Sequence, residues 1–221
     1  MEREIDLSQV SDGRRYQAND LVKADCQGCA GCSACCRNMG NSVLLDPYDF
    51  YRLRSGAGLT FEAMIAAGQI ELNLVEGIIL PNLAMSGPGA ACAFLDSQGR
   101  CSIHAHRPGF CRLFPLGRLY ENGSFSYFLQ VHECRNQNRT KVKVKKWMDT
   151  PEFDRYEDFI CRWHYFLKEI SRRISQKGSE AAQAAKAASM YVLNQFYVKS
   201  YDTGLDFYSQ FEERMKGGLP V

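Results

Sequence analysis

Cysteine is the residue type most able to do chemistry in this 221-residue chain, which contains ten cysteines in an uneven distribution. Half of them lie in one short run: Cys26, Cys29, Cys32, Cys35 and Cys36. Two cysteines separated by two residues can supply two thiolates to one metal ion from a single turn, and this spacing occurs three times in succession here. The run therefore predicts a loop that wraps around metal.

The run can be grouped in more than one way. Successive side chains diverge, so the adjacent Cys35 and Cys36 indicate either two metal sites or one larger cluster. Cys26, Cys29, Cys32 and Cys36 have the C-x2-C-x2-C-x3-C spacing of bacterial ferredoxins, but the proline that usually follows is absent. Grouping Cys29, Cys32, Cys35 and Cys36 instead leaves Cys26 as an additional thiol.

Composition and charge narrow the classes of function. The net charge of +2, from 27 basic and 25 acidic residues, does not favour binding to nucleic acid or to an anionic membrane. The first nine residues lack the apolar core of a signal peptide, and no apolar run approaches the ~20 residues that span a bilayer. We therefore expect a cytoplasmic protein, in which clustered thiols favour metal binding over disulfides.

A second set of cysteines extends the pattern, at Cys92, Cys101, Cys111 and Cys134. With the first run they make the chain resemble the YkgJ-like cysteine cluster family, whose members are described as zinc- or iron-chelating proteins. The matching pieces are Cys29-x2-Cys32-x2-Cys35-Cys36-Arg37, Leu45-Asp46-Pro47-Tyr48-Asp49, Cys92-x-Phe94-Leu95, Cys101-x-Ile103 and Arg107-Pro108-x2-Cys111-Arg112-x-Phe114-Pro115.

The resemblance and the residues together imply a set of metal ligands. The candidates are Cys29, Cys32, Cys35, Cys36, Cys92, Cys101, Cys111 and Cys134. Their number and the adjacent pair favour a 4Fe–4S cluster, in one or two sites, over zinc, and a structural zinc module without catalytic activity is the alternative. Arg37, Arg107 and Arg112 are expected to offset the negative charge of the thiolates, or else to form salt bridges with nearby aspartates.

What such a centre does is less constrained. The family is similar in its cysteine pattern to flagellin lysine N-methylases, which bind an iron–sulfur cluster, so methyl transfer to lysine joins redox chemistry and protein maturation as hypotheses. Whether the chain is an enzyme stays open, and a protein substrate or a redox partner is the expected macromolecular partner. His104, His106 and His132 are interpreted as surface or hydrogen-bonding histidines, and Cys161 as a buried small hydrophobe.

The elements that must position these residues predict an α+β fold. An N-terminal arm over 1–25 precedes a cysteine-cluster domain over 26–146, and a helical segment over 147–221 packs on it. Within the cluster domain, helices are expected after Asp46 and after Thr60. Glu76-Gly77 and Asn122-Gly123 each predict the turn of a β-hairpin, and 135–146 predicts an exposed connection or edge strand.

The C-terminal segment has a helical pattern. Aromatic and aliphatic residues recur every three or four positions from Phe153 to Ile170, and Thr150 is expected to cap this helix with Pro151 in its first turn. Two further helices are predicted over 180–199 and 205–215.

Overall fold

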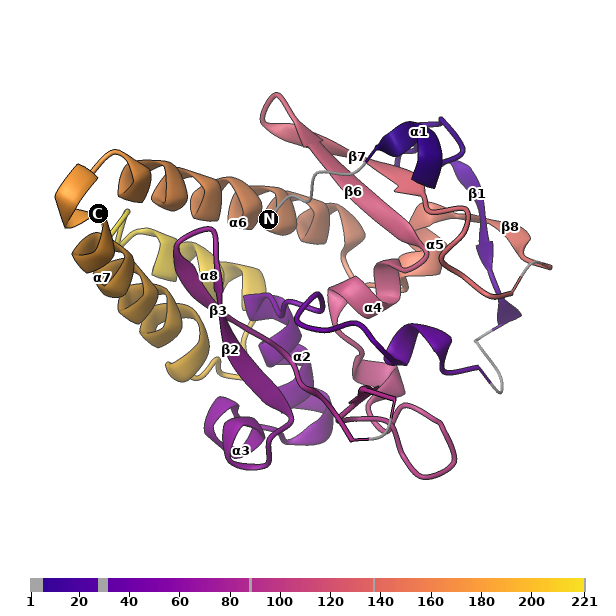
Figure 1. Cartoon of the computed structure of the whole chain (residues 1–221), viewed down its shortest axis with the longest axis horizontal. Coiled ribbons are helices and arrows are strands. Elements are labelled where there is room, and N and C mark those ends of the chain that lie inside the picture. Colours follow the sequence, from indigo (N-terminus) through magenta and orange to yellow (C-terminus); the bar gives the residue numbers. More distant parts are fainter. Residues whose placement is uncertain (1–5, 28–31, 88, 137, 221) are drawn as a thin grey trace.

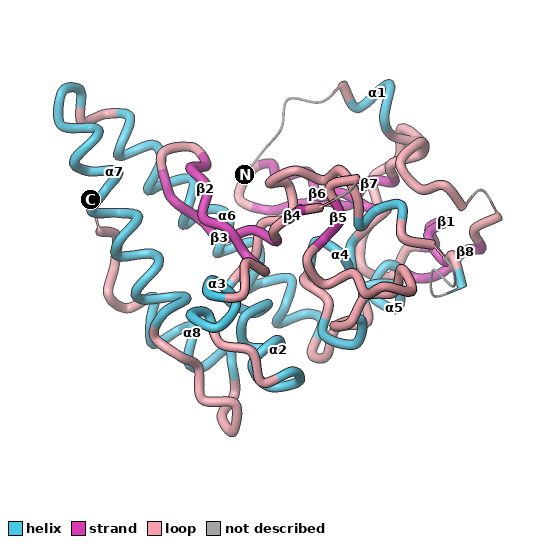
Figure 2. The backbone as a smooth tube through the Cα atoms, turned by 60° about the horizontal axis from the view of Figure 1, so that its bottom comes forward, coloured by secondary structure: helices cyan, strands magenta, loops and turns pink. Residues whose placement is uncertain are grey.

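The computed structural model describes residues 6–27, 32–87, 89–136 and 138–220, and it confirms the predicted α+β fold (Figure 1). The long helices of the C-terminal part gather on one side, where the hairpin over 70–83 packs against them, and the other strand pairs lie on the opposite side. Figure 2 shows the same separation, with α7 (Ala181–Leu193) at one end and the pair of β1 (Leu21–Asp25) and β8 (Thr140–Lys143) at the other. The cysteine-bearing segments, apart from the one with Cys161 on the long helix over 153–175, occupy the strand-rich side.

Two β-hairpins form where the turn residues predict them. β2 (Ile70–Val75) pairs with β3 (Ile78–Leu83) across Glu76-Gly77, and β6 (Leu116–Glu121) pairs with β7 (Ser124–Leu129) across Asn122-Gly123. All four turn residues have positive φ, from 48° at Glu76 to 85° at Gly77. Such turns match the right-handed twist of the flanking strands, so the local sequence fixes the register of both hairpins.

The remaining strand pairs join segments that the sequence does not obviously connect. β1 pairs antiparallel with β8, so the chain before the cysteine run meets the segment after Cys134. Val22 and Ala24 of β1 are buried, and a short helix, α1 (Leu7–Val10), precedes them. β4 (Met85–Ser86) pairs with β5 (Ala91–Cys92), which places one cysteine at a strand end.

Two short helices begin at the predicted caps. α2 (Pro47–Ala57) is capped by Asp46, whose Oδ1 accepts from Asp49 N at 2.9 Å, and Gly58 follows its last residue with positive φ. α3 (Phe61–Ala66) is capped by Thr60. Because each cap is a contact across three residues, these helix starts could be read from the sequence alone.

The cap predicted for the longest helix is wrong. α6 (Phe153–Ser175) begins after Glu152, and the Thr150 side chain does not cap it. Thr150 is buried, and its hydroxyl donates to Met148 O of α5 (Val144–Met148) and accepts from Arg112 Nε of α4 (Gly109–Leu113). The local sequence pattern assigns the Thr150 hydroxyl to the helix cap, but in the structure it bonds to a residue 38 positions earlier in the chain.

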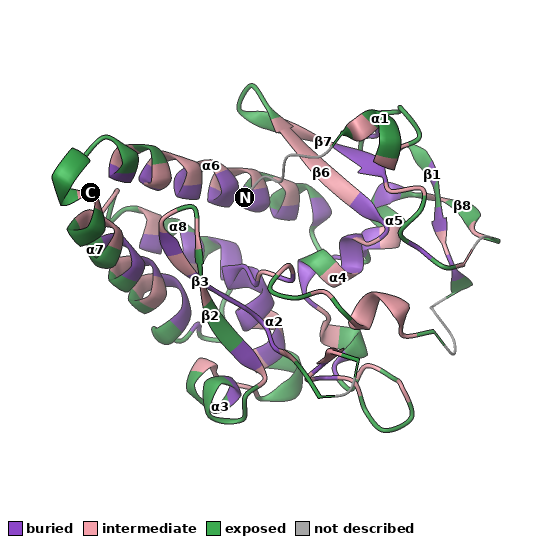
Figure 3. Ribbon diagram, viewed as in Figure 1, coloured by how far each residue is buried: buried purple, intermediate pink, exposed green. Residues whose placement is uncertain are grey.

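Aromatic packing holds the helical side together. After a short turn, η4 (Gly178–Glu180), α7 continues into η5 (Asn194–Val198), a π-helical turn, and α8 (Phe207–Met215) returns along α6. Phe159 lies at the centre, with ring centroids 4.8 Å from Phe211 and 5.1 Å from Phe207. Figure 3 shows the inner faces of α6 and α8 buried. No helix in the described part of the chain is long and apolar enough to span a membrane.

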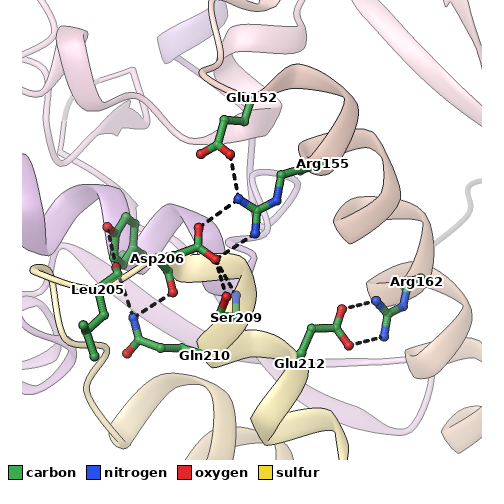
Figure 4. Close-up of polar contacts among 9 residues, drawn as sticks. Glu152, Arg155, Arg162, Leu205, Asp206, Ser209, Gln210 and Glu212 are labelled. Carbon is green, nitrogen blue, oxygen red and sulfur yellow. Dashed lines mark hydrogen bonds and ion pairs between the residues drawn. The ribbon is translucent and has the colours of Figure 1, made fainter.

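Ion pairs at the surface also connect α6 with α8 (Figure 4). Arg155 Nη2 lies 2.7 Å from Asp206 Oδ2, and Arg162 pairs with Glu212. Asp206 has a second task, because its carboxylate accepts from Ser209 N at 2.7 Å and caps α8.

Asp206→Ala is expected to destabilise the protein more than Arg155→Ala does. The first change removes a helix cap, which costs about 0.5–2 kcal/mol, together with the ion pair. The second removes exposed ion pairs, worth about 0.2–1 kcal/mol, and the contact of the guanidinium with the Tyr208 ring, but no helix cap. Urea unfolding of both variants measures the difference, and equal costs would show that the ion pair, rather than the cap, carries the effect.

Candidate metal centre

Cysteines from three separate segments line one cavity of about 60 Å³ on the strand-rich side. Its cysteine wall consists of Cys32, Cys35, Cys36, Cys92, Cys101 and Cys111. Apolar side chains such as Val43, Leu83 and Phe94 form most of the remaining wall, and the charged or titratable groups besides the thiols are Arg100, His104 and Arg107. The cavity is therefore a soft, thiol-rich and mainly apolar pocket.

Backbone pairing brings the first two cysteine segments together. Cys35 and Cys36 lie in a 3-10 turn, η2 (Ala34–Cys36), and the chain directly after it pairs with β5 through an Arg37–Ala91 bridge. Asn38 N donates to Ala90 O at 2.9 Å in the same place. The end of the first run is thus fixed beside Cys92.

The third segment is held by a loop and a short helix. Leu95 bridges to Cys101, and Ser102 N donates to Phe94 O at 2.8 Å, which places Cys101 next to the Cys92 segment. The next cysteine along the chain, Cys111, lies in the middle of α4. A turn, η3 (His104–His106), connects the two.

Four of the thiols form a mutually interacting set: Cys35, Cys92, Cys101 and Cys111. Each of them interacts electrostatically with the other three. Burial raises the pKa of Cys92, Cys101 and Cys111, and the neighbouring cysteines raise it further. The raised pKa of Cys35 has a hydrogen bond with the Cys36 thiol as its largest cause.

The raised pKa values of the thiols indicate which kind of ion the cavity would bind. Several thiolates without a counter-charge repel one another in a low-dielectric wall, so the neutral thiols are favoured. A soft cation that replaces the thiol protons removes this repulsion, because thiolates are its preferred ligands. The donor set therefore fits a thiolate-bound metal.

The three predicted arginines take different places. Arg107 lines the cavity and lowers the pKa of Cys35 and Cys101, against the larger effects that raise it. Arg112 is buried, and its guanidinium donates to Thr150 Oγ1 and Arg107 O. Arg37 is half-buried beside the loop around Gly89. Of the three, the structure brings only Arg107 to the thiols.

The other candidate ligands lie outside this wall. Cys134 is buried but does not line the cavity, and the same is true of Cys26. Cys29 lies outside the described residues. Within those residues, no three Cys, His, Asp or Glu side chains already meet as a preformed site for a metal ion. Both four-cysteine groupings read from spacing include Cys29, so they stay predictions.

The four residues that the sequence analysis did not count as ligands, three histidines and Cys161, also have definite places. His104 lines the cavity, which its spacing from Cys101 could have suggested, and His106 packs its ring against Gly56. His132 is exposed. Cys161 is half-exposed rather than buried, and its thiol donates to Gly123 O at 3.4 Å. Arg100 is exposed and lines the cavity, and no feature of the sequence identified it as a candidate site residue.

Comparison with known proteins supports the prediction of metal binding at the level of the family. A family model named CxxCxxCC and described as a "putative zinc- or iron-chelating domain" matches residues 26–150, which is more than half of the chain. Neither the curated proteins nor the solved structures contain a match. The matched range begins at the cysteine run and includes every cavity cysteine. The chain therefore belongs to the CxxCxxCC family of zinc- or iron-chelating domains.

Proposed function

We propose that this chain binds a 4Fe–4S cluster in the cysteine-lined cavity, with Cys35, Cys92, Cys101 and Cys111 as its ligands. The observation that carries the proposal is the convergence of these four thiols from three segments on one cavity. Each of the four interacts electrostatically with the other three, which supports a shared site. Four thiolates are the usual protein ligands of such a cluster.

The excess of thiols favours a cluster over a single zinc ion. Structural zinc is satisfied by four ligands, whereas Cys32 and Cys36 also line the same cavity. Cys36 is hydrogen-bonded to Cys35, and hydrogen bonds to ligand sulfur atoms tune the potential of iron–sulfur centres. Arg107 supplies positive charge on the same wall.

The chemistry that such a cluster supplies is one-electron transfer. The chain's own residues would exclude water through the apolar wall and supply positive charge through Arg107 and Arg100. The proposal includes a protein redox partner and a reducing compartment such as the cytoplasm, where thiols stay available for metal. Methyl transfer to lysine stays a prediction from the resemblance alone.

Protein purified under anaerobic conditions is expected to be brown and to contain iron with acid-labile sulfide, because a cluster brings both. The measurement is iron, sulfide and zinc analysis of the full chain, together with its visible absorption spectrum. A colourless protein with stoichiometric zinc and no sulfide would refute the cluster and leave a zinc module in the same cavity.

A further inference from the structure

The start of α2 is hydrogen-bonded to α4, the helix that carries Cys111. Asp49 is 1% exposed, and its Oδ1 accepts from Gly109 N, the first residue of α4, at 2.7 Å. The other oxygen of the same carboxyl, Oδ2, accepts from Asp46 N at 3.1 Å. One buried side chain therefore connects the capping box of α2 to the first turn of α4.

Arg112 holds the other side of the same turn. It is 3% exposed, and Nη1 donates to Arg107 O while Nε donates to Thr150 Oγ1 at 3.2 Å. Its guanidinium also lies 5.6 Å from the ring centroid of Tyr156 and 5.9 Å from that of Tyr48. These contacts fix the chain on both sides of Cys111.

Gly109 shows how closely α4 is seated. A Cβ at this position would overlap Tyr156 Oη and would lie 3.5 Å from Asp46 Oδ2. Tyr156 is fully buried and cannot move aside, and its hydroxyl accepts from Arg118 Nη2 at 3.1 Å. The backbone of α4 therefore approaches the carboxyl pair as closely as a glycine allows.

We propose that Asp49 is a positioning residue for the metal centre, which holds Gly109 N–H and thereby directs Cys111 into the cavity. The inference rests on the cluster site proposed above. Asp49 itself does not line the cavity, so it is not a ligand; it holds Cys111 through α4, and its charge also raises the pKa of the Cys111 thiol. Groups that orient metal ligands in this way typically contribute about 10–100-fold to metal affinity.

The test is a double-mutant cycle between Asp49 and Cys111 in the full chain. Affinity for Co²⁺ is measured anaerobically on the apo protein, by competition with a chelator. Asp49→Ala is expected to weaken Co²⁺ binding by about tenfold or more. In a Cys111→Ser background the same change should weaken it by less than about twofold, because an interaction that acts through Cys111 is lost only once.

Two further variants separate positioning from general stability. Thr60→Ala removes the cap of α3 and should leave Co²⁺ affinity within about twofold of the parent, since it costs a similar cap without touching α4. Asp49→Asn keeps an oxygen that can accept from Gly109 N, so it should restore most of the affinity. If Asp49→Ala does not fold, Asp49→Ser replaces it in the cycle.

The possible outcomes distinguish this inference from the proposed function. Equal losses on both backgrounds, or no loss from Asp49→Ala while Cys111→Ser weakens binding, would overturn the positioning role and leave the ligand set standing. No loss from Cys111→Ser would overturn both. A loss from Asp49→Ala that is absent in the Cys111→Ser background and rescued by Asp49→Asn supports the role.

Discussion

Cys111→Ser is expected to reduce bound metal to less than half of the parent value. Cys111 lies on the cavity wall and interacts with Cys35, Cys92 and Cys101, so its loss breaks the four-thiol set. A serine oxygen is a harder donor that binds iron or zinc less well than a thiolate does. Metal and sulfide analysis of the anaerobically purified variant, normalised to protein, gives the result.

The matched control is Cys161→Ser, which changes the same atom on α6, away from the cavity. Cys161 is half-exposed and donates to Gly123 O, a bond that a serine hydroxyl can also make. Its metal content should equal that of the parent, with a stability change of about 0.5 kcal/mol or less. If Cys161→Ser lost metal while Cys111→Ser kept it, the assignment of the thiols to the centre would be wrong.

The parts of the fold that could be predicted are the parts that local chemistry decides. Asn122-Gly123 fixes a hairpin because both residues take positive φ, and Asp46 begins a helix because its side chain reaches a backbone N–H three residues away. In each case the decisive contact spans two to four residues. The same reasoning identified the cysteine run, since its spacing is local as well.

The parts that could not be predicted depend on contacts between distant segments. Thr150 fits the pattern of a helix cap, but its hydroxyl is bonded to Arg112, which approaches only after the chain has folded. The pairing of β1 with β8 joins residues more than a hundred positions apart.

The site shows the same limit. Spacing predicted the cysteines as candidate ligands but did not show which of them share a cavity. It made Cys134 and Cys111 equal candidates, whereas of these two only Cys111 lines the cavity. It also grouped Arg112 with Arg107, although Arg112 does not line the cavity and instead donates a hydrogen bond to Arg107 O, just before α4. These roles depend on how deeply each side chain is buried and on where it points, and neither property is visible in a spacing pattern.

Removal of the metal is expected to loosen the cavity wall while the helical side stays folded. The wall is built from short elements, a 3-10 turn, a two-residue strand and α4, and several of its thiols repel one another when deprotonated. Metal binding supplies much of the ordering free energy in segments of this kind. The helices α6 and α8 instead pack through Phe159, Phe207 and Phe211, which need no metal.

Amide hydrogen exchange of the full chain, before and after anaerobic chelation, measures this difference. We expect exchange in 34–38 and 91–113 to accelerate by about tenfold or more, while the buried face of α6 keeps its protection, because local opening costs less than global unfolding. Exchange that accelerates equally throughout α6 would mean that the helical side depends on the metal as well. Unchanged exchange at the cavity wall would mean that metal does not order it, and the apolar wall around Val43, Leu83 and Phe94 would then hold the thiol segments in place by packing alone.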